Sequence, residues 1–312
     1  MTSFVNVNGF NCRYELSGKD DAPETIIFVN GIACPLESWN LIKEPLDKKY
    51  RSLCYDMRGQ WFSEVTTDKP YSFLMMADDL YELSKKLDIE SAHIVGTSLG
   101  GEVGLWFALM YPQKVKSLSI LASASEINEL MRVRVERWRR CAVGALNAIE
   151  KSDGDSKVLS KQAEEFYDCL LPDTYSNTFL ESNLSVIDQK RDGFKALVTK
   201  EFFAGQINLY DMFFKLNGAE KITDRLHEIK CPSLIIGADQ DCVKPPQFSE
   251  LIAKNIKDSH LHIFKDTGHA VFSERFTEIS VMIDNLISNR NVNSVIFNSD
   301  MISKLTNNRF VN

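Results

Sequence analysis

HIVGTSLGGEVG, residues 93–104, joins an apolar run directly to a run of helix-forming residues. This order predicts a strand, an abrupt turn and a helix. Within it, Gly96-Thr97-Ser98-Leu99-Gly100 fits the pattern G-x-S-x-G, in which a serine sits on a strained turn with its hydroxyl exposed above a sheet. We expect a side chain at position 96 or 100 to collide with the neighbouring strand or the returning helix. The alternative is a glycine-rich turn that merely links the two elements.

Length and composition exclude several classes of protein. The chain has 312 residues, 44% of them hydrophobic, and a formal net charge of -7. It is long enough for one large domain with an inserted module, and its acidic balance argues against nucleic acid as a partner. The N-terminus lacks the pattern of a secretory signal, and no apolar run is long enough to span a bilayer. Seven scattered cysteines without a C-x-x-C pair look like reduced thiols, so we expect a cytoplasmic location.

Strand and helix patterns alternate along most of the chain. A hairpin is expected around Asn8-Gly9, because short alternating runs flank this turn signal. Further strands are expected at 25–30, 51–55, 92–95, 117–121, 232–236 and 260–264, and helices at 38–46, 72–87, 102–110, 247–255 and 272–289, with Ser38 and Ser72 as caps. This alternation predicts an α/β fold with a doubly wound, mostly parallel sheet.

A helical insertion interrupts the alternation between residues 126 and 218. The predicted organisation is a core in two parts, 1–125 and 219–290, separated by the insertion at 126–218 and followed by a tail at 291–312. One face of the first insertion helix carries apolar residues at helical spacing: Met131, Val135, Trp138, Ala142, Ala145 and Ile149. Five arginines lie largely off this face, as a solvated basic surface or as a patch for an acidic substrate or phosphate group: Arg132, Arg134, Arg137, Arg139 and Arg140. The insertion is also rich in aromatic residues, which could wall an apolar cleft.

A serine hydroxyl is a poor nucleophile at neutral pH, so Ser98 needs a base to act in catalysis. His269 is the best candidate, because it follows a predicted strand on a polar turn, and catalytic groups gather beyond the carboxyl ends of parallel strands. The four other histidines lie within or before strands and are more readily structural: His93, His227, His260 and His262.

The base needs a carboxylate to fix its tautomer and hold its charge. Asp239 and Asp241 both lie beyond a strand end, and Glu126 is a third candidate. A tetrahedral oxyanion would further need N–H donors, for which the backbone amides of Leu99 and Ile32 are the best placed.

At these residues the chain resembles the alpha/beta-hydrolase family, from about Phe4 to Arg290. The matching motifs are N-G-I at 30–32 with Trp39 downstream, D-M-R-G-Q-W-F-S at 56–63, G-T-S-L-G-G at 96–101, G-A-D-Q-D-C-V-K-P at 237–245 and G-H at 268–269. The resemblance implies an alpha/beta-hydrolase fold in which the insertion forms a helical cap over the site. It also implies these roles: Ser98 as nucleophile, Asp241 as orienting acid, His269 as base, and Ile32 and Leu99 as oxyanion donors.

Two residues depart from the family pattern. Asn30 stands in place of the usual histidine, which alters how the oxyanion loop is braced but leaves its amides in place. Trp61 stands where a glycine is usual, so we expect a different path for this loop, with Trp61 or Phe62 facing the cleft as a substrate contact. In detail the chain is most similar to small carboxylesterases and enol-lactonase-like members.

The expected function is hydrolysis of a small carboxylic ester or lactone through an acyl-Ser98 intermediate. One alternative is a thioesterase or acyl transferase, in which the insertion arginines would hold a phosphorylated carrier. Another is a ligand-binding receptor with slow hydrolysis, suggested by the aromatic insertion and the tail. No cofactor or metal is expected, because the sequence lacks H-E-x-x-H, G-x-G-x-x-G and Walker motifs and clustered Cys/His spacing.

Overall fold

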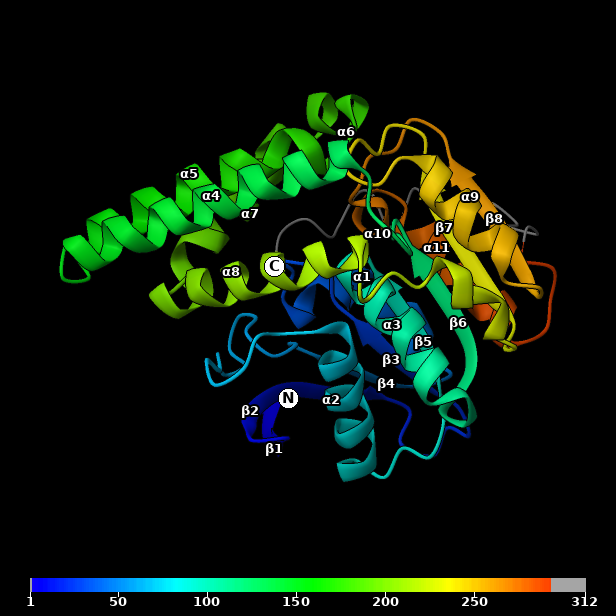
Figure 1. Cartoon of the computed structure of the whole chain (residues 1–312). Coiled ribbons are helices and arrows are strands. Elements are labelled where there is room, and N and C mark those ends of the chain that lie inside the picture. Colours follow the sequence, from blue (N-terminus) through cyan, green and yellow to red (C-terminus); the bar gives the residue numbers. More distant parts are fainter. Residues whose placement is uncertain (1, 293–312) are drawn as a thin grey trace.

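An eight-stranded sheet forms the centre of the computed structural model, which describes residues 2–292 (Figure 1). The strand order is β1-β2-β4-β3-β5-β6-β7-β8, with β1 and β2 antiparallel to their neighbours and the remaining pairs parallel. The strands are β1 (Thr2–Val7), β2 (Phe10–Gly18), β3 (Thr25–Val29), β4 (Arg51–Tyr55), β5 (Ala92–Thr97), β6 (Val115–Leu121), β7 (Ser233–Ala238) and β8 (Ser259–Phe264). The predicted α/β class and the mostly parallel sheet are confirmed.

The first two strands form the predicted hairpin. Asn8 and Gly9 have φ angles of 45° and 84°, and two-residue hairpin turns of type I′ require positive φ at both central residues. The second strand then pairs antiparallel with β4, which places the hairpin at one edge of the sheet.

Helices cover both faces of the sheet, so that two hydrophobic cores form. Strands β5 and β7 are buried along their whole length, as expected for parallel strands covered on both sides. One core includes α2 (Phe73–Lys86), α3 (Leu99–Met110) and α9 (Pro246–Asn255). The other includes α1 (Asn40–Leu46), α10 (Val271–Glu274) and α11 (Phe276–Ile287). The sheet is therefore doubly wound, as predicted.

Three helix boundaries differ from the predicted ones, and one cap is confirmed. Ser72 caps α2 by accepting a hydrogen bond from the backbone N–H of Met75 at 3.0 Å. Ser38 caps nothing, because a 3₁₀ helix, η1 (Leu36–Trp39), precedes α1 and includes it. Helix α3 starts at position 99 rather than 102, because the turn leads into the helix without a linker. The last predicted helix is interrupted at Arg275, with φ −127°, into α10 and α11.

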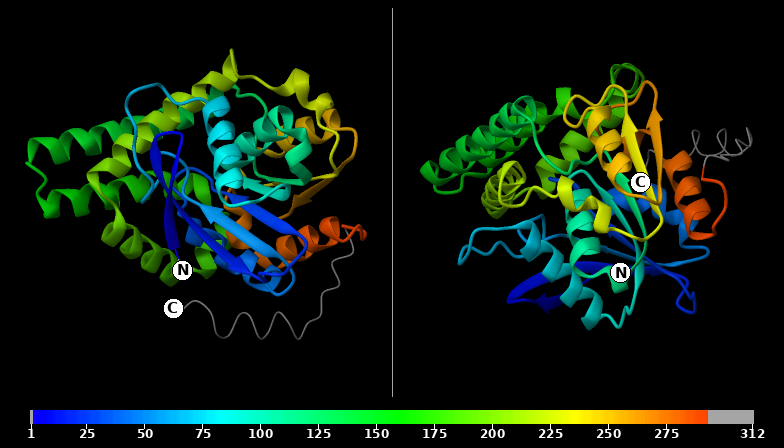
Figure 2. Two further views of the ribbon diagram at one scale, coloured as in Figure 1. Left: turned by 90° about the horizontal axis from the view of Figure 1, so that it is seen from below. Right: turned by 45° about the vertical axis from the view of Figure 1, so that its right-hand side comes forward.

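Five α-helices lie between β6 and β7, in the stretch for which a helical insertion is predicted, and are called the insertion below: α4 (Glu129–Lys151), α5 (Ser156–Thr174), α6 (Asn177–Ser182), α7 (Leu184–Leu197) and α8 (Lys200–Phe213). Helix α4 packs against α5 and α8, and α5 packs against α7. All six residues of the predicted apolar face of α4 are buried. Figures 1 and 2 show the insertion to one side of the sheet, with the long helices α4 and α5 projecting beyond it.

The tail predicted at 291–312 lies, from residue 293 on, outside the described residues. Among residues 2–292, no helix has the length and apolar character needed to cross a membrane.

Candidate active site

Ser98 sits on the tight turn between β5 and α3, in a strained backbone conformation. Its φ of 51° lies in the left-handed region, which residues other than glycine rarely adopt. The turn leaves no room for side chains at the flanking glycines. A Cβ on Gly96 would lie 2.3 Å from the carbonyl oxygen of Gly100, and one on Gly100 would lie 2.1 Å from that of Val29. The predicted collisions with the helix and the neighbouring strand are therefore present.

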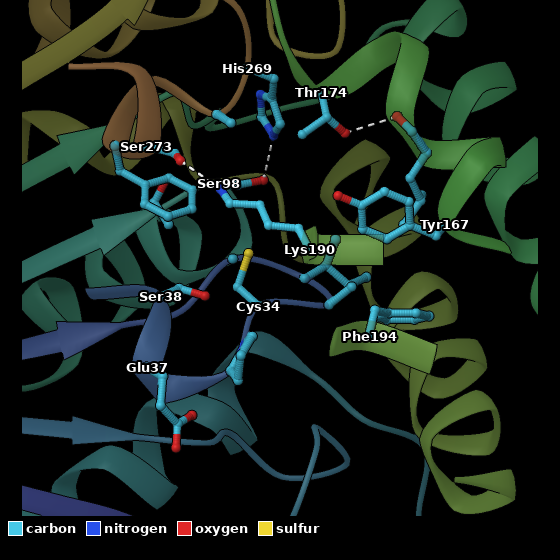
Figure 3. A pocket seen from close by; sticks show the side chains of 18 of the residues that line it. Cys34, Glu37, Ser38, Ser98, Tyr167, Thr174, Lys190, Phe194, His269 and Ser273 are labelled. Atoms are coloured by element: carbon cyan, nitrogen blue, oxygen red, sulfur yellow. Dashed lines mark hydrogen bonds between the residues drawn. The ribbon is translucent and has the colours of Figure 1, made fainter. Parts of the chain in front are cut away.

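A chain of hydrogen bonds joins three side chains from distant parts of the sequence. His269 Nε2 lies 3.0 Å from Ser98 Oγ (Figure 3). His269 Nδ1 lies 2.8 Å from Asp241 Oδ2. Asp241 is buried, and its other oxygen accepts hydrogen bonds from the backbone N–H groups of Val243 and Lys244 at 2.9 and 2.7 Å. Because this carboxylate is held from both sides, it can orient the imidazole and stabilise its protonated form.

The loop that carries His269 is attached to the insertion. The N–H of Ala270 donates to the carbonyl of Thr174 at 2.7 Å. Glu274 accepts hydrogen bonds from the backbone N–H groups of Gly268 and Ser176 at 3.2 and 2.9 Å. The position of the imidazole therefore depends on the insertion as well as on the core.

The other titratable candidates make contacts of their own away from His269. Asp239 accepts only a long contact, 3.4 Å, from the backbone N–H of Thr267, and Glu126 bonds the Thr223 hydroxyl and pairs with Lys221. Among the histidines, His93 is hydrogen-bonded to Ser117 and Glu24, and burial lowers the pKa of His93. His227 is hydrogen-bonded to the carbonyl of Asp224. His260 and His262 lie on strand β8. Within residues 2–292, none of these groups is hydrogen-bonded to His269 or Ser98.

The two predicted oxyanion donors flank Ser98. Leu99 is the first residue of α3, where the helix dipole favours negative charge. Gly31, just before Ile32, lies against the serine, since a Cβ on this glycine would be 3.4 Å from Ser98 Cβ. Ile32, Ser98 and Leu99 also line a small cavity of about 20 Å³.

Asn30, which stands where the family pattern has a histidine, braces the loop that carries Ile32. Its Oδ1 accepts a hydrogen bond from the Trp39 indole N–H at 2.7 Å, and its Nδ2 donates to the carbonyl of Cys34 at 3.1 Å. Nearby, Asp56 accepts from the backbone N–H of Leu36 at 2.8 Å, and burial raises the pKa of Asp56 to about 6. The amide therefore ties both ends of the loop between positions 30 and 34.

Trp61 lines the cavity beside Ser98, whereas Phe62 does not. Trp61 has a φ of 46°, in the left-handed region that a glycine adopts readily. Its ring lies 5.6 Å from Phe194 and 5.0 Å from Phe202, between ring centres, and lines the cavity described below. The expectation that Phe62 faces the cleft is wrong, because Phe62 is not among the residues that line this cavity; the residue is 43% exposed and its ring packs against the Arg13 guanidinium at 4.7 Å.

A cavity of about 420 Å³ opens over Ser98 and His269 (Figure 3). Core and insertion both contribute to its walls, which are mostly apolar, and this volume suits a small molecule. The apolar side chains that line it include Ile32, Leu41, Trp61, Trp138, Leu170, Phe194, Leu197 and Phe272. The polar or charged ones include Glu37, Ser38, Thr174, Lys190 and Ser273.

Lys190 is the cation that lines this cavity, and the sequence analysis missed it. Its Nζ donates to the Tyr175 hydroxyl at 3.2 Å and to Ser273 Oγ at 3.0 Å. The five insertion arginines lie outside the cavity lining, and each is paired with a carboxylate: Arg132 with Glu129, Arg134 and Arg137 with Asp173, Arg139 with Asp211 and Arg140 with Glu136. A lysine on an amphipathic helix resembles a solvated residue, so no sequence signal distinguished it.

Comparison with protein families gives one match that covers most of the chain. The family model described as the alpha/beta hydrolase fold matches residues 24–276. A putative carbamate hydrolase, RutD, of Stutzerimonas stutzeri is 30% identical over 279 residues, covering 88% of this chain and 96% of that protein. The proline iminopeptidase PfmaB of Pestalotiopsis fici is 25% identical over 280 residues, covering 88% and 95%.

Solved structures share the same fold. MGS-M2, an alpha/beta hydrolase enzyme from a Medee basin deep-sea metagenome library, aligns with a TM-score of 0.81 at 21% identity and covers 93% of this chain and 98% of its own. The enol-lactonase from Burkholderia xenovorans aligns with a TM-score of 0.75 at 23% identity, covering 92% and 100%.

Proposed function

The chain belongs to the alpha/beta-hydrolase family and is a hydrolytic enzyme, and on this premise we propose that it cleaves a small carboxylic ester or lactone through an acyl-enzyme intermediate. The observation that carries the proposal is the continuous hydrogen-bonded chain from Ser98 through His269 to the buried Asp241. This arrangement has the parts that a serine nucleophile requires, namely a base within reach and a carboxylate behind the base.

In the proposed mechanism, Ser98 Oγ attacks the carbonyl carbon of the substrate while His269 Nε2 takes its proton. Asp241 holds the resulting imidazolium, and the amides of Ile32 and Leu99 stabilise the oxyanion of the tetrahedral intermediate. His269 then protonates the departing alkoxide, which leaves an acyl group on Ser98. His269 then takes a proton from water, which attacks the acyl carbon; the bond to Ser98 Oγ breaks, the imidazolium returns the proton to that oxygen, and the acid is released.

The cavity supports a small substrate with a substantial apolar part. Its volume of about 420 Å³ and its aromatic and aliphatic walls favour an ester or lactone of modest size. The thioesterase alternative loses its supporting feature, because the arginines meant for a phosphorylated carrier are paired with carboxylates outside the cavity. The tail that suggested the receptor alternative lies beyond residue 292, outside the described residues. A cytoplasmic location remains part of the proposal, and all seven cysteines are free thiols.

A fluorophosphonate probe tests the nucleophile directly. The wild-type protein should become labelled, and Ser98→Ala should prevent labelling and lower kcat for p-nitrophenyl hexanoate by a factor of about 10⁶. Ser38→Ala is the matched control, because Ser38 lines the same cavity and should leave labelling intact. Labelling that persists in Ser98→Ala would refute the proposed role of this serine.

A further inference from the structure

We propose that the cavity selects substrates that carry a carboxylate, and that the ammonium group of Lys190 binds it. This inference rests on the proposed hydrolytic function, because it assigns a substrate class to the same site. It goes beyond that function by giving the site an anionic specificity that the hydrogen-bonded chain at Ser98 does not itself require.

The hydrogen-bond partners of Lys190 are uncharged. Lys190 lies on α7 and its side chain reaches across the cavity to Ser273 (Figure 3). It donates to two hydroxyl oxygens, those of Ser273 and Tyr175, and burial holds the pKa of Tyr175 well above its usual value, so the phenol stays neutral. An ammonium has three donors, and two bonds to hydroxyls leave one for a ligand. Ser273 also keeps its own proton to donate, because its oxygen accepts from the lysine.

The carboxylates nearby are engaged elsewhere. Glu37 lines the cavity but pairs with Arg13. Glu274 accepts three hydrogen bonds, from the backbone N–H of Gly268 and from the backbone N–H and hydroxyl of Ser176. In the part of the chain that the structure describes, no carboxylate oxygen forms an ion pair with Lys190. The charge of Glu274 acts on the ammonium through space and favours its charged form, but no described carboxylate pairs with it directly.

Two buried lysines elsewhere in the molecule have carboxylate partners, in contrast to Lys190. Lys244 is buried and pairs with Glu102. Lys43 is also buried and pairs with Glu15. On α7 itself, Lys195 pairs with Glu164 at 3.0 Å. Lys190 is exposed as a residue, so a ligand in the cavity can reach its ammonium group, whose pKa desolvation lowers.

The position of Lys190 in the cavity indicates which class of molecule would bind to it. Lys190, Ser98 and His269 line one cavity, so the bound anion and the reacting carbonyl belong to one small molecule. The remaining walls are largely apolar, with Trp61 and Phe194 among them. One cation with neutral hydroxyls suits a monoanion better than a dianionic phosphate. The structure therefore assigns a substrate with an apolar body, a scissile ester or lactone and one carboxylate.

Two pairs of esters that differ only in charge test this inference. In the first pair the charge is on the acyl side: mono-p-nitrophenyl adipate against p-nitrophenyl hexanoate. In the second it is on the leaving group: 4-acetoxybenzoate against 4-acetoxybenzamide. The wild-type enzyme should show a higher kcat/KM for the anionic member of at least one pair. Lys190→Met should reduce that preference by about 10- to 100-fold, as expected for the loss of a charge-assisted hydrogen bond.

Three further proteins make the result decisive. Lys195→Met, on the same helix but outside the cavity lining, should keep the wild-type preference. Lys190→Arg, which retains the charge, should keep part of it. Circular dichroism would show whether Lys190→Met is folded, and if it is not, the Lys190→Gln variant replaces it. Equal kcat/KM within both pairs for the wild-type enzyme would overturn the inference.

An equilibrium measurement separates this inference from the proposed function. Benzoate and benzamide are titrated by calorimetry into the wild type, Lys190→Met and Lys195→Met. Tighter binding of benzoate that disappears only in Lys190→Met supports the anion site, even if Ser98→Ala retains turnover. Failure of Ser98→Ala to abolish turnover would refute the proposed nucleophile alone, and equal binding of the two ligands by the wild type would refute the anion site alone.

Discussion

The core and the helical insertion contribute to the site by different physical means. Core residues are positioned by backbone constraint: Ser98 has a φ of 51°, and the glycines around it touch neighbouring carbonyl oxygens too closely for any side chain. The insertion contributes walls, through side chains such as Trp138 and Phe194, and one cation, Lys190. Under the proposed function, the core would determine which reaction is possible, and the insertion, together with core residues such as Trp61, would determine which molecules fit.

Two lysines near the site show the same division. Lys244, from the core, is buried and pairs with Glu102 next to the Asp241 turn. Lys190, from the insertion, faces the cavity with only hydroxyl partners. The first charge is satisfied within the fold and is structural, whereas the second is left to be satisfied by a ligand.

The largest expected effect comes from a change in the core. Asp241→Asn should lower kcat by a factor of about 10⁴, because an amide can neither fix the reactive imidazole tautomer nor stabilise its charge. The loss should be equal for p-nitrophenyl hexanoate and mono-p-nitrophenyl adipate, measured in parallel. Asp239→Asn is the control and should leave kcat nearly unchanged. A loss confined to the anionic ester would break the proposed division between core and insertion.

The next effect concerns stability and contrasts the two lysines. Lys244→Met should destabilise the protein by about 3–5 kcal/mol, because it leaves the buried Glu102 carboxylate without its partner. Urea unfolding measures this change. The double variant Glu102→Gln/Lys244→Met should recover much of it, and Lys190→Met should cost far less than Lys244→Met. Similar costs for the two lysines would contradict their assignment as structural and ligand-binding.

A pair of variants at Trp61 sharpens the role of backbone constraint. Both Trp61→Gly and Trp61→Ala remove the ring from its packing against Phe194 and Phe202, so their difference reports mainly the cost of the positive φ. Trp61→Ala should be less stable than Trp61→Gly by about 1 kcal/mol, measured by urea unfolding. Equal stability would show that position 61 is not constrained in the way the structure indicates. Both variants should also accept bulkier esters than the wild type.

The smallest effect is expected on the outer surface of the insertion. Arg140 is 77% exposed and pairs with Glu136 one helical turn away. Arg140→Gln should change the free energy of unfolding by less than about 0.5 kcal/mol and leave kcat/KM for mono-p-nitrophenyl adipate unchanged. A loss of anion preference comparable to that of Lys190→Met would return the arginines to consideration as the anion site.

Much of the architecture could be predicted from local patterns. The strands, the helix capped by Ser72 and the apolar face of α4 follow from periodicity and capping, which act over a few residues. The helical start at position 36 was missed, because η1 places Ser38 inside a turn rather than before one. This helix start depends on long-range contacts, in which the backbone N–H of Leu36 bonds Asp56 and the Trp39 indole bonds Asn30. Local sequence patterns do not predict such contacts.

By itself the sequence determined the order of strands and helices, the tight turn at Ser98, and the strand-end positions from which Asp241 and His269 approach it. These features are local, since glycine spacing and hydrophobic period restrict the backbone wherever the chain folds. The family resemblance already favoured Asp241 over Asp239 and Glu126, and the tertiary structure brings it into contact with His269. Only the tertiary structure decided that Trp61 lines the cavity while Phe62 does not, and that Lys190 faces the site while the arginines do not. Each of these outcomes depends on how one element docks on another, which is set by long-range packing and not by neighbours in the chain.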